Sequence, residues 1–207
     1  MSSVLIVDDH HVVSAGVKMV VKDVFKEIRS IDSLDKLLVE LKKNVPDLLI
    51  LDAEFEGSFS ITKLRSVRLL YPDLKIIIYT SYNSLELCGR YLNEGVKGYI
   101  LKSTPLEELE RGIKSVMQGR VFMDSIIAAK MMEMRFQSER RLSQLSPREY
   151  EVFLQIAAGV SYKTIAKGLN LTVGTVGTYR TRIGEKLGLS SSEEIRQFAQ
   201  LNGLLEK

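Results

Sequence analysis

Short apolar runs alternate with amphipathic stretches through the first half of the chain. Residues 4–8 form an apolar run that ends in acids, which is typical of a strand buried on both faces of a parallel sheet. The stretch 12–25 then places its valines at the spacing of one helix face. The alternation continues to residue 119, with further strands predicted at residues 27–31, 47–52, 74–80 and 97–101. Five units, each a strand followed by a helix, predict an α/β domain with a doubly wound, parallel five-stranded sheet and helices on both faces.

The pattern changes after Gly119. Residues 126–141 have helical spacing mixed with a polar run, so we interpret residues 120–142 as a partly helical linker. From Leu145 onward every apolar period is helical, and the sequence Ser-Pro-Arg-Glu at residues 146–149 is a typical helix start. The sequence therefore predicts a first domain at 1–119, a linker at 120–142 and a small all-α domain at 143–207.

Charge and composition add two expectations. The net charge of +3 is uneven, because residues 1–119 carry −1 while residues 120–142 and 143–207 carry +2 each, which indicates different partners for the two domains. No apolar run approaches the ~18–20 residues that span a bilayer, and no cationic segment precedes the first apolar run. We expect a cytoplasmic protein that does not bind membranes. The single cysteine, Cys88, is expected to be a half-buried hydrophobe, since it has no partner for a disulfide.

Polar residues follow four of the five predicted strands. In parallel sheets such positions meet at one edge, where sites are usually found. Acids that converge there suit Mg²⁺, which prefers oxygen ligands, and one carboxylate could then act as a nucleophile toward a phosphoryl group. A lysine would neutralise the charge of the transferred group, and a threonine would donate a hydrogen bond to it. The residues at these strand ends are Asp8, Asp9, Asp52, Thr80 and Lys102.

This ordered set, with Tyr99 three residues before the lysine, resembles the receiver domain of two-component response regulators, a flavodoxin-like fold, over residues 1–119. The resemblance implies that Asp52 accepts a phosphoryl group from a sensor histidine kinase. It implies a Mg²⁺ site formed by Asp8, Asp9, Asp52 and the backbone carbonyl of Glu54, in which Asp9 and Asp52 bind the ion directly and Asp8 lies nearby, in reach through a water molecule. The residues that respond to the phosphoryl group would be Thr80, Tyr99 and Lys102.

The loop after Asp52 departs from the receiver pattern. Phe55 stands where methionine is usual and Glu56 where proline is usual, and Glu54 and Glu56 add negative charge beside the site. One interpretation is loop variation with the phosphoryl chemistry intact. In the alternative, phosphorylation is slow or dispensable, and the receiver acts as a dimerisation or sensing module. A phosphohydrolase is disfavoured, because such enzymes carry Asp-x-Asp after the first strand and this chain has adjacent aspartates; we expect no enzyme.

The second domain has a helix-turn-helix pattern. A helix at residues 161–169, a tight turn and a helix from Val173 fit this motif, with Thr172 as a natural N-cap. On a helical wheel the second helix has an apolar stripe and an opposite polar side. The residues predicted to reach base edges are Thr178, Thr181 and Arg182, and those predicted to reach phosphates are Ser161, Tyr162, Lys163, Arg180 and Lys186.

The stretches LSPRE at 145–149, Thr175-Val176 and KLG at 186–188 resemble the output domain of NarL/FixJ (LuxR-type) regulators over nearly all of residues 143–207. The resemblance implies binding to promoter DNA, adds Thr175 to the expected DNA contacts, and implies a homodimer on DNA. Gly177 and Tyr179 depart from the family, which often has lysine and histidine there. The predicted dimer contacts in the last helix are Ile195, Phe198 and Ala199.

Overall fold

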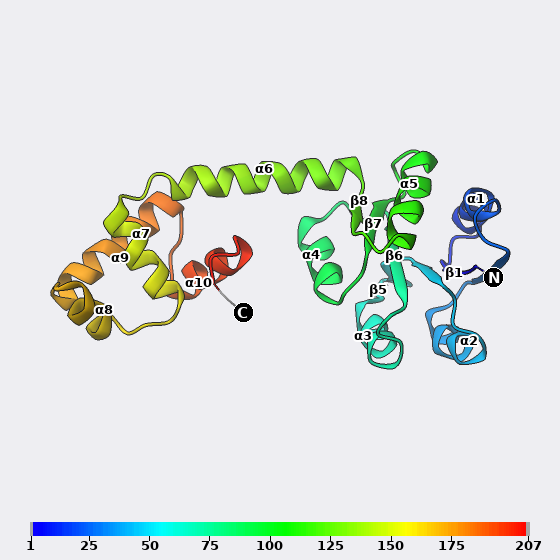
Figure 1. The fold of residues 1–207 in the computed structure, drawn as a ribbon, viewed down its shortest axis with the longest axis horizontal. Coiled ribbons are helices and arrows are strands. Elements are labelled where there is room, and N and C mark those ends of the chain that lie inside the picture. The colour runs from blue at the N-terminus through cyan, green and yellow to red at the C-terminus, as the bar shows by residue number, and fades with distance from the viewer. Residues whose placement is uncertain (1, 206–207) are drawn as a thin grey trace. The chain divides into compact units, whose positions relative to one another are not determined.

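A computed structural model describes residues 2–205 of the chain (Figure 1). The chain forms two compact units, Met1–Lys130 and Met131–Lys207, and helix α6 (Ser125–Leu142) crosses the boundary between them. The two units have different architectures, so each is described by itself.

The first unit is built on a six-stranded parallel sheet with the order β2-β1-β3-β6-β7-β8. The five predicted strands are all present. The sixth, β8, pairs with β7 and lies just beyond residue 119, where we predicted the first domain to end. It has only two residues, too few to show a periodicity. The strands are β1 (Ser3–Val7), β2 (Glu27–Ile31), β3 (Leu48–Leu51), β6 (Lys75–Thr80), β7 (Gly98–Leu101) and β8 (Phe122–Met123).

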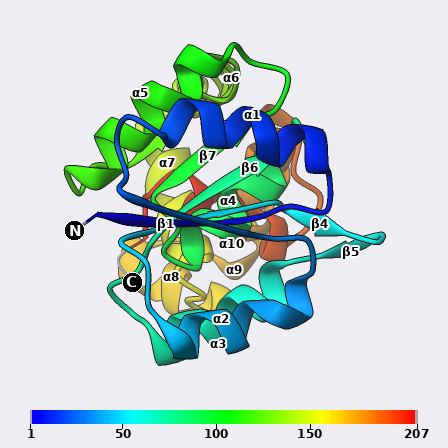
Figure 2. The same cartoon turned by 90° about the vertical axis from the view of Figure 1, so that its right-hand side faces the viewer.

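Helices cover both faces of this sheet, as predicted. Figure 2 shows α1 (His11–Val21) and α5 (Leu106–Met117) on one face, and α2 (Leu37–Lys43) and α3 (Ile61–Leu70) on the other. A 3₁₀ turn at Leu34–Lys36 leads into α2, and α4 (Leu85–Asn93) packs beside β7. Successive strand residues face opposite sides, so β1, β3, β6 and β7 are buried almost throughout. The side toward α1 and α5 includes Val4, Ile6, Leu48, Ile50, Ile77 and Ile100.

A small antiparallel hairpin, β4 (Glu54–Phe55) and β5 (Ser58–Phe59), follows β3. Glu56 and Gly57 link its strands with positive φ angles of 48° and 78°, which is the pattern of a type I′ turn. The sequence predicted only a loop here. The residues that depart from the receiver pattern therefore form an ordered turn that a Met-Pro pair would not make.

Helix α6 begins on a buried aspartate. Asp124 is fully buried, and its Oδ1 accepts hydrogen bonds from the backbone N–H groups of Ile126 (2.9 Å) and Ile127 (3.0 Å). Its Oδ2 accepts a hydrogen bond from the N–H of Leu101 at 2.7 Å. One carboxylate thus caps the helix and binds it to the end of β7, next to Lys102.

The second unit is helical and has its own core. Serine or threonine caps the N-terminus of each helix after α6: Ser146 forms a capping box with Glu149, while Ser161, Thr172 and Ser191 each accept a hydrogen bond from the backbone N–H three residues later. The predicted helix-turn-helix is present as α8 and α9. The helices are α7 (Pro147–Ala157), α8 (Tyr162–Leu169), α9 (Val173–Leu187) and α10 (Ser192–Leu201). Within residues 2–205, no helix combines the length and the apolar character that a membrane crossing requires.

Candidate functional site

The strand register gathers the predicted acidic residues at one edge of the sheet. Val7 pairs with Leu51, so Asp8 and Asp52 both follow directly on neighbouring strands. Thr80, at the end of β6, pairs with Leu101, at the end of β7, so Lys102 follows directly after β7 at the same edge of the sheet. Asp8, Asp52 and Thr80 are all buried. The site therefore lies where the rule for parallel sheets placed it.

Lys102 lies between two carboxylates. Its Nζ is 2.5 Å from Asp52 Oδ2 and 2.8 Å from Asp8 Oδ2, and its side chain is only 10% exposed. Burial raises the pKa of Asp52, and the hydrogen bond from Lys102 opposes this effect only in part. Burial lowers the pKa of Lys102, but its hydrogen bonds to Asp52 and Asp8 outweigh burial and raise it overall. Lys102 is therefore a fixed cation, and Asp52 is a poorly hydrated carboxylate beside it.

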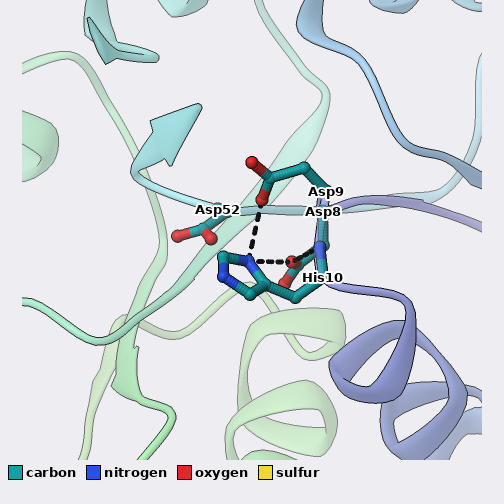
Figure 3. A group of neighbouring side chains, drawn as sticks. All are labelled: Asp8, Asp9, His10 and Asp52. Carbon is teal, nitrogen blue, oxygen red and sulfur yellow. Dashed lines mark hydrogen bonds and ion pairs between the residues drawn. The ribbon is translucent and has the colours of Figure 1, made fainter. Parts of the chain in front are cut away.

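The same carboxylates fit a divalent cation. Asp8, Asp9, His10 and Asp52 each offer a ligand atom, and these atoms lie within 4.8 Å of one another (Figure 3). Asp9 Oδ1 is buried and accepts no hydrogen bond from residues 2–205, although His10 Nδ1 lies 2.8 Å away. A buried carboxylate oxygen without a donor is suited to ligate a metal, and a set dominated by carboxylates matches the preference of Mg²⁺ for oxygen.

His10 also belongs to this cluster, although it was not among the predicted site residues. Its backbone N–H donates to Asp8 Oδ1 at 2.8 Å, and its ring Nδ1 is 3.3 Å from the same oxygen. It occupies the N-cap position of α1, which turns its ring toward the carboxylates of Asp8 and Asp9 (Figure 3). The sequence feature that could have indicated this role is the position of His10 directly after Asp8 and Asp9.

An open pocket of about 450 Å³ leads to Asp52. One wall is formed by the β4–β5 hairpin and Tyr82, whose hydroxyl donates a hydrogen bond to Glu54 Oε2. The ring of Phe59 meets the ring of Tyr82 edge-on at a centroid distance of 5.2 Å. Sequence reasoning missed Tyr82, because nothing local to it indicates a contact with the hairpin. The lining residues are Asp9, His10, Asp52, Glu54, Glu56, Ser81 and Tyr82.

Thr80 and Tyr99 converge on the loop that follows β6. Thr80 Oγ1 accepts a hydrogen bond from the backbone N–H of Tyr82 at 3.2 Å. The hydroxyl of Tyr99 donates to the backbone carbonyl of Tyr82 at 2.8 Å, and its side chain is completely buried. Burial also raises the pKa of Tyr99, which keeps the hydroxyl protonated as a donor. Movement of this loop would therefore change the hydrogen bonds of both Thr80 and Tyr99, the two switch residues that are expected to respond to the phosphoryl group.

The helix-turn-helix presents a small polar surface. Thr178, Thr181 and Arg182 are exposed on α9, and the two threonine hydroxyls donate to the carbonyls of Gly174 and Gly177 at 3.2 Å each. At the start of α8, Ser161 and Lys163 are exposed, while Tyr162 packs partly against the domain core. Thr175 is half-buried, and its N–H donates to the Thr172 cap at 3.1 Å.

Three residues of α9 are engaged inside the domain. Lys186 forms an ion pair with the buried Glu149, with its Nζ 2.5 Å from Glu149 Oε2. The guanidinium of Arg180 donates a hydrogen bond to the carbonyl of Ser190. Tyr179, which stands where the family often has histidine, packs against the core. The structure thus gives Arg180 and Lys186 internal partners that the helical wheel did not reveal.

The predicted dimer residues of α10 lie mainly in the core. Ile195 and Ala199 have no exposed surface, and Phe198 is partly buried with its ring edge-on to Phe153 at a centroid distance of 6.2 Å. Within this unit, Ile195 and Ala199 therefore have no surface to offer a partner. Leu201, at the end of the helix, is 80% exposed.

Comparisons with known proteins agree with this geometry. Residues 4–114 match the response regulator receiver domain family, and residues 143–199 match the luxR family of bacterial regulatory proteins. Response regulator GacA of Pseudomonas syringae pv. syringae (strain B728a) is 30% identical over 100% of this chain and 99% of its own length.

Solved structures of the response regulator RcsB have a similar fold. RcsB of Salmonella typhimurium matches with a TM-score of 0.69 at 23% identity, over 96% of this chain and 98% of its own. An RcsB–DNA complex matches with a TM-score of 0.59 at 22% identity, over 97% and 98%. The chain belongs to the NarL/FixJ-type response regulators, with an N-terminal receiver domain and a C-terminal LuxR-type DNA-binding domain.

Proposed function

We propose that Asp52 accepts a phosphoryl group from a sensor histidine kinase and that this event controls binding to promoter DNA. The observation that carries the first step is the position of Lys102, whose ammonium lies between Asp8 and Asp52, and Asp52 lines an open acidic pocket. A nucleophilic carboxylate, a fixed cation and oxygen ligands for a metal are the parts that phosphoryl transfer requires.

The proposed step is an in-line displacement. A carboxylate oxygen of Asp52 attacks the phosphorus of the donor, an O–P bond forms, and the bond to the leaving group breaks with its electron pair departing on the donor. Asp9 and Asp52 would hold Mg²⁺ with the backbone carbonyl of Glu54, and Asp8 would stand beside it. When bound, Mg²⁺ supplies charge neutralisation to the phosphoryl oxygens. Lys102 would then exchange its bond to Asp52 for one to a phosphoryl oxygen, and Thr80 would donate another.

Intact-mass spectrometry tests this step. Acetyl phosphate with Mg²⁺ should add one phosphoryl group, about 80 Da, to the wild-type chain. Asp52→Asn should remain unmodified under the same conditions, and omission of Mg²⁺ should slow the labelling of the wild type. An unmodified wild type, or a labelled Asp52→Asn, would contradict the assignment.

We propose that the second domain binds promoter DNA through the exposed face of α9 and the start of α8, in the cytoplasm, where the promoters are. The LuxR-type family match and the DNA complex of RcsB support this proposal. Arg182 would read base edges together with Thr178 and Thr181. The contacts to the backbone would come from Ser161, Tyr162, Lys163 and Thr175.

A homodimer would match two half-sites about one helical turn apart. Because Ile195 and Ala199 are buried, the outward side of α10 near Phe198 and Leu201 is the part of that helix available for pairing. We also propose the domain limits 1–119, 120–142 and 143–207, with β8 extending the receiver sheet into the linker. The whole chain would act as a regulator and not as an enzyme.

Selection from a random DNA pool tests the DNA-binding step. The wild-type chain should enrich one sequence and protect it in footprints, and Arg182→Ala should weaken binding to it about 5- to 150-fold, the range for one good base contact. Arg120→Ala, an exposed arginine in the first unit, serves as the control. Unchanged footprints for Arg182→Ala would show that the base-reading face lies elsewhere.

A second candidate keeps the DNA-binding step but needs no phosphate. It is favoured by one observation: Glu54 and Glu56 of the β4–β5 hairpin line the pocket together with Asp52, and they place negative charge where an anionic phosphodonor would enter. The acidic hairpin at the pocket mouth would then limit access to Asp52. Under this candidate, Asp52→Asn binds the selected DNA as tightly as the wild type treated with acetyl phosphate.

A further inference from the structure

The three cations of α9 have different surroundings. Arg182 is exposed, and within residues 2–205 it makes no ion pair. Lys186 and Arg180 are both bound to groups of their own domain. A phosphate contact by either cation would therefore have to share it with an internal partner.

Lys186 ties the end of α9 to the start of α7. Its Nζ is 2.5 Å from Glu149 Oε2, and the two side chains are 37% and 5% exposed. Glu149 is 37 residues away in the sequence, so the pair links two separate helices. The lysine also stands in the last turn of α9, where a cation is favourable to the helix dipole.

Glu149 is itself held in place by a capping box. Its Oε2 accepts the backbone N–H of Ser146 at 2.7 Å, and Ser146 Oγ accepts the N–H of Glu149 at 3.3 Å. The hydrogen bond from Lys186, followed by the one from the Ser146 backbone, lowers the pKa of Glu149 to about 2. The carboxylate is therefore ionised and fixed whenever the domain is folded near neutral pH.

Arg180 binds the opposite flank of the same helix. At 100° per residue, Arg180 and Lys186 lie about 120° apart, on either side of the buried stripe that contains Val176, Ile183 and Leu187. Arg180 donates to the Ser190 carbonyl beyond the helix end. Arg180 thus links one flank of α9 to the turn that follows the helix, whereas Lys186 links the other flank to a separate helix, α7.

We propose that Lys186, through Glu149, is a positioning residue that sets the orientation of α9 toward the bases, and that Arg182 is the cation of this helix that contacts DNA. The inference rests on the proposed DNA-binding function. A small rotation of α9 would move Thr178 and Arg182 away from base edges, since such contacts tolerate only about 10–20° of error. Backbone phosphates are less demanding, so sequence discrimination would suffer more than general affinity.

Salt titrations of DNA binding separate a positioning role from a phosphate contact. The full-length chain is titrated with its selected DNA sequence and with a scrambled sequence at several salt concentrations. Lys186→Met, which keeps the aliphatic stem, should lower the preference for the selected sequence about tenfold and leave scrambled-DNA affinity and the salt slope unchanged. Lys163→Met, the matched control at a proposed phosphate contact, should lower affinity for both sequences and reduce the slope by about 0.9. The same loss of slope for Lys186→Met would overturn the proposal.

Glu149→Gln gives an independent test, because it releases Lys186 without touching the α9 surface. A positioning role predicts reduced discrimination, as in Lys186→Met. A phosphate-contacting lysine predicts the reverse, a steeper salt slope and tighter binding to both sequences, which would also overturn the proposal. If Lys186→Met fails to fold, the double variant Lys186→Met/Glu149→Gln, which leaves no buried unpaired charge, replaces it with the same expected outcome. Failure of the wild type to select any sequence would instead contradict the proposed DNA-binding function.

Discussion

The hydroxyl of Tyr82 donates a hydrogen bond to the carboxylate of Glu54, so the loop after β6 and the β4–β5 hairpin meet at the mouth of the pocket that holds Asp52. The backbone of the same tyrosine binds Thr80 and Tyr99. The mouth of the pocket and the two predicted switch residues are thus connected through one residue. The hairpin acids are therefore part of the site and contribute to its electrostatics.

Glu54→Gln should accelerate the labelling of Asp52 by acetyl phosphate. The substitution removes one negative charge from the mouth and keeps an oxygen that can accept the Tyr82 hydroxyl. A unit charge is worth about 1 kcal/mol at 4 Å in water and less beyond that, so we expect about a two- to fivefold faster rate at low salt. The gain should shrink at high salt because ions screen the charge. Rates are followed by intact mass, with Glu133→Gln, an exposed glutamate of α6, as control. Equal rates at low salt would show that the hairpin charge does not affect the donor.

Asp52→Asn should stabilise the receiver in the absence of Mg²⁺. The folded-state pKa of Asp52 is raised by burial, so its ionised form costs stability above that pKa, and the cost disappears as the pH falls through it. Asparagine removes the cost at neutral pH. A gain of about 1 kcal/mol, a common size for one substitution, would raise the midpoint of thermal unfolding by about 2–4 °C.

Thermal unfolding in EDTA at several pH values measures this difference. The advantage of Asp52→Asn should be largest at neutral pH and should fade on acidification. Mg²⁺ should stabilise the wild type, by about 2.7 kcal/mol at a hundredfold excess over its Kd, and should stabilise Asp9→Ala much less. A variant less stable than the wild type at neutral pH would contradict the assigned charge cluster.

Substitution by alanine should have opposite effects on the stability of the second domain at two glycines of α9, Gly177 and Gly184. A Cβ at Gly177 would meet no atom within 4 Å, so Gly177→Ala should stabilise the second domain by up to about 1 kcal/mol through helix propensity. A Cβ at Gly184 would lie 2.5 Å from the carbonyl oxygen of Leu189, so Gly184→Ala should destabilise it by about 1–3 kcal/mol. Urea unfolding followed by circular dichroism compares the pair, and a gain from Gly184→Ala would mean that the turn after α9 can move.

The Glu149–Lys186 pair should make the second domain sensitive to acid. The pKa of Glu149 in the folded state, about 2, lies below its ordinary value of 4.5. The contribution of the ion pair to stability is therefore complete above the ordinary pKa and is lost as the pH falls toward 2. Glu149→Gln removes this titration. Between pH 6 and pH 3, the midpoint of thermal unfolding of the second domain should therefore fall less steeply with pH in Glu149→Gln than in the wild type. Equal slopes for the two proteins would rule out this contribution.

Local pattern was enough to locate the acidic site. The strand-end positions of Asp8, Asp52, Thr80 and Lys102 follow from apolar runs, and parallel strands carry their carboxyl ends to one edge. The caps at Ser146 and Thr172 were equally visible, because a cap depends on residues only a few positions away. Strand β8 was not visible, since two residues have no period and are held by pairing with β7.

The sequence by itself therefore determined the two-domain order, the parallel sheet, the residues at its carboxyl edge and the polar face of the second helix of the helix-turn-helix. Only the tertiary structure decided which charges are free and which are used internally. Lys186 and Glu149, or Tyr82 and Glu54, are 37 and 28 residues apart, and nothing in either local stretch indicates the contact. Periodicity shows which side of a helix is polar, but packing between distant segments decides whether a polar side chain meets solvent or another side chain.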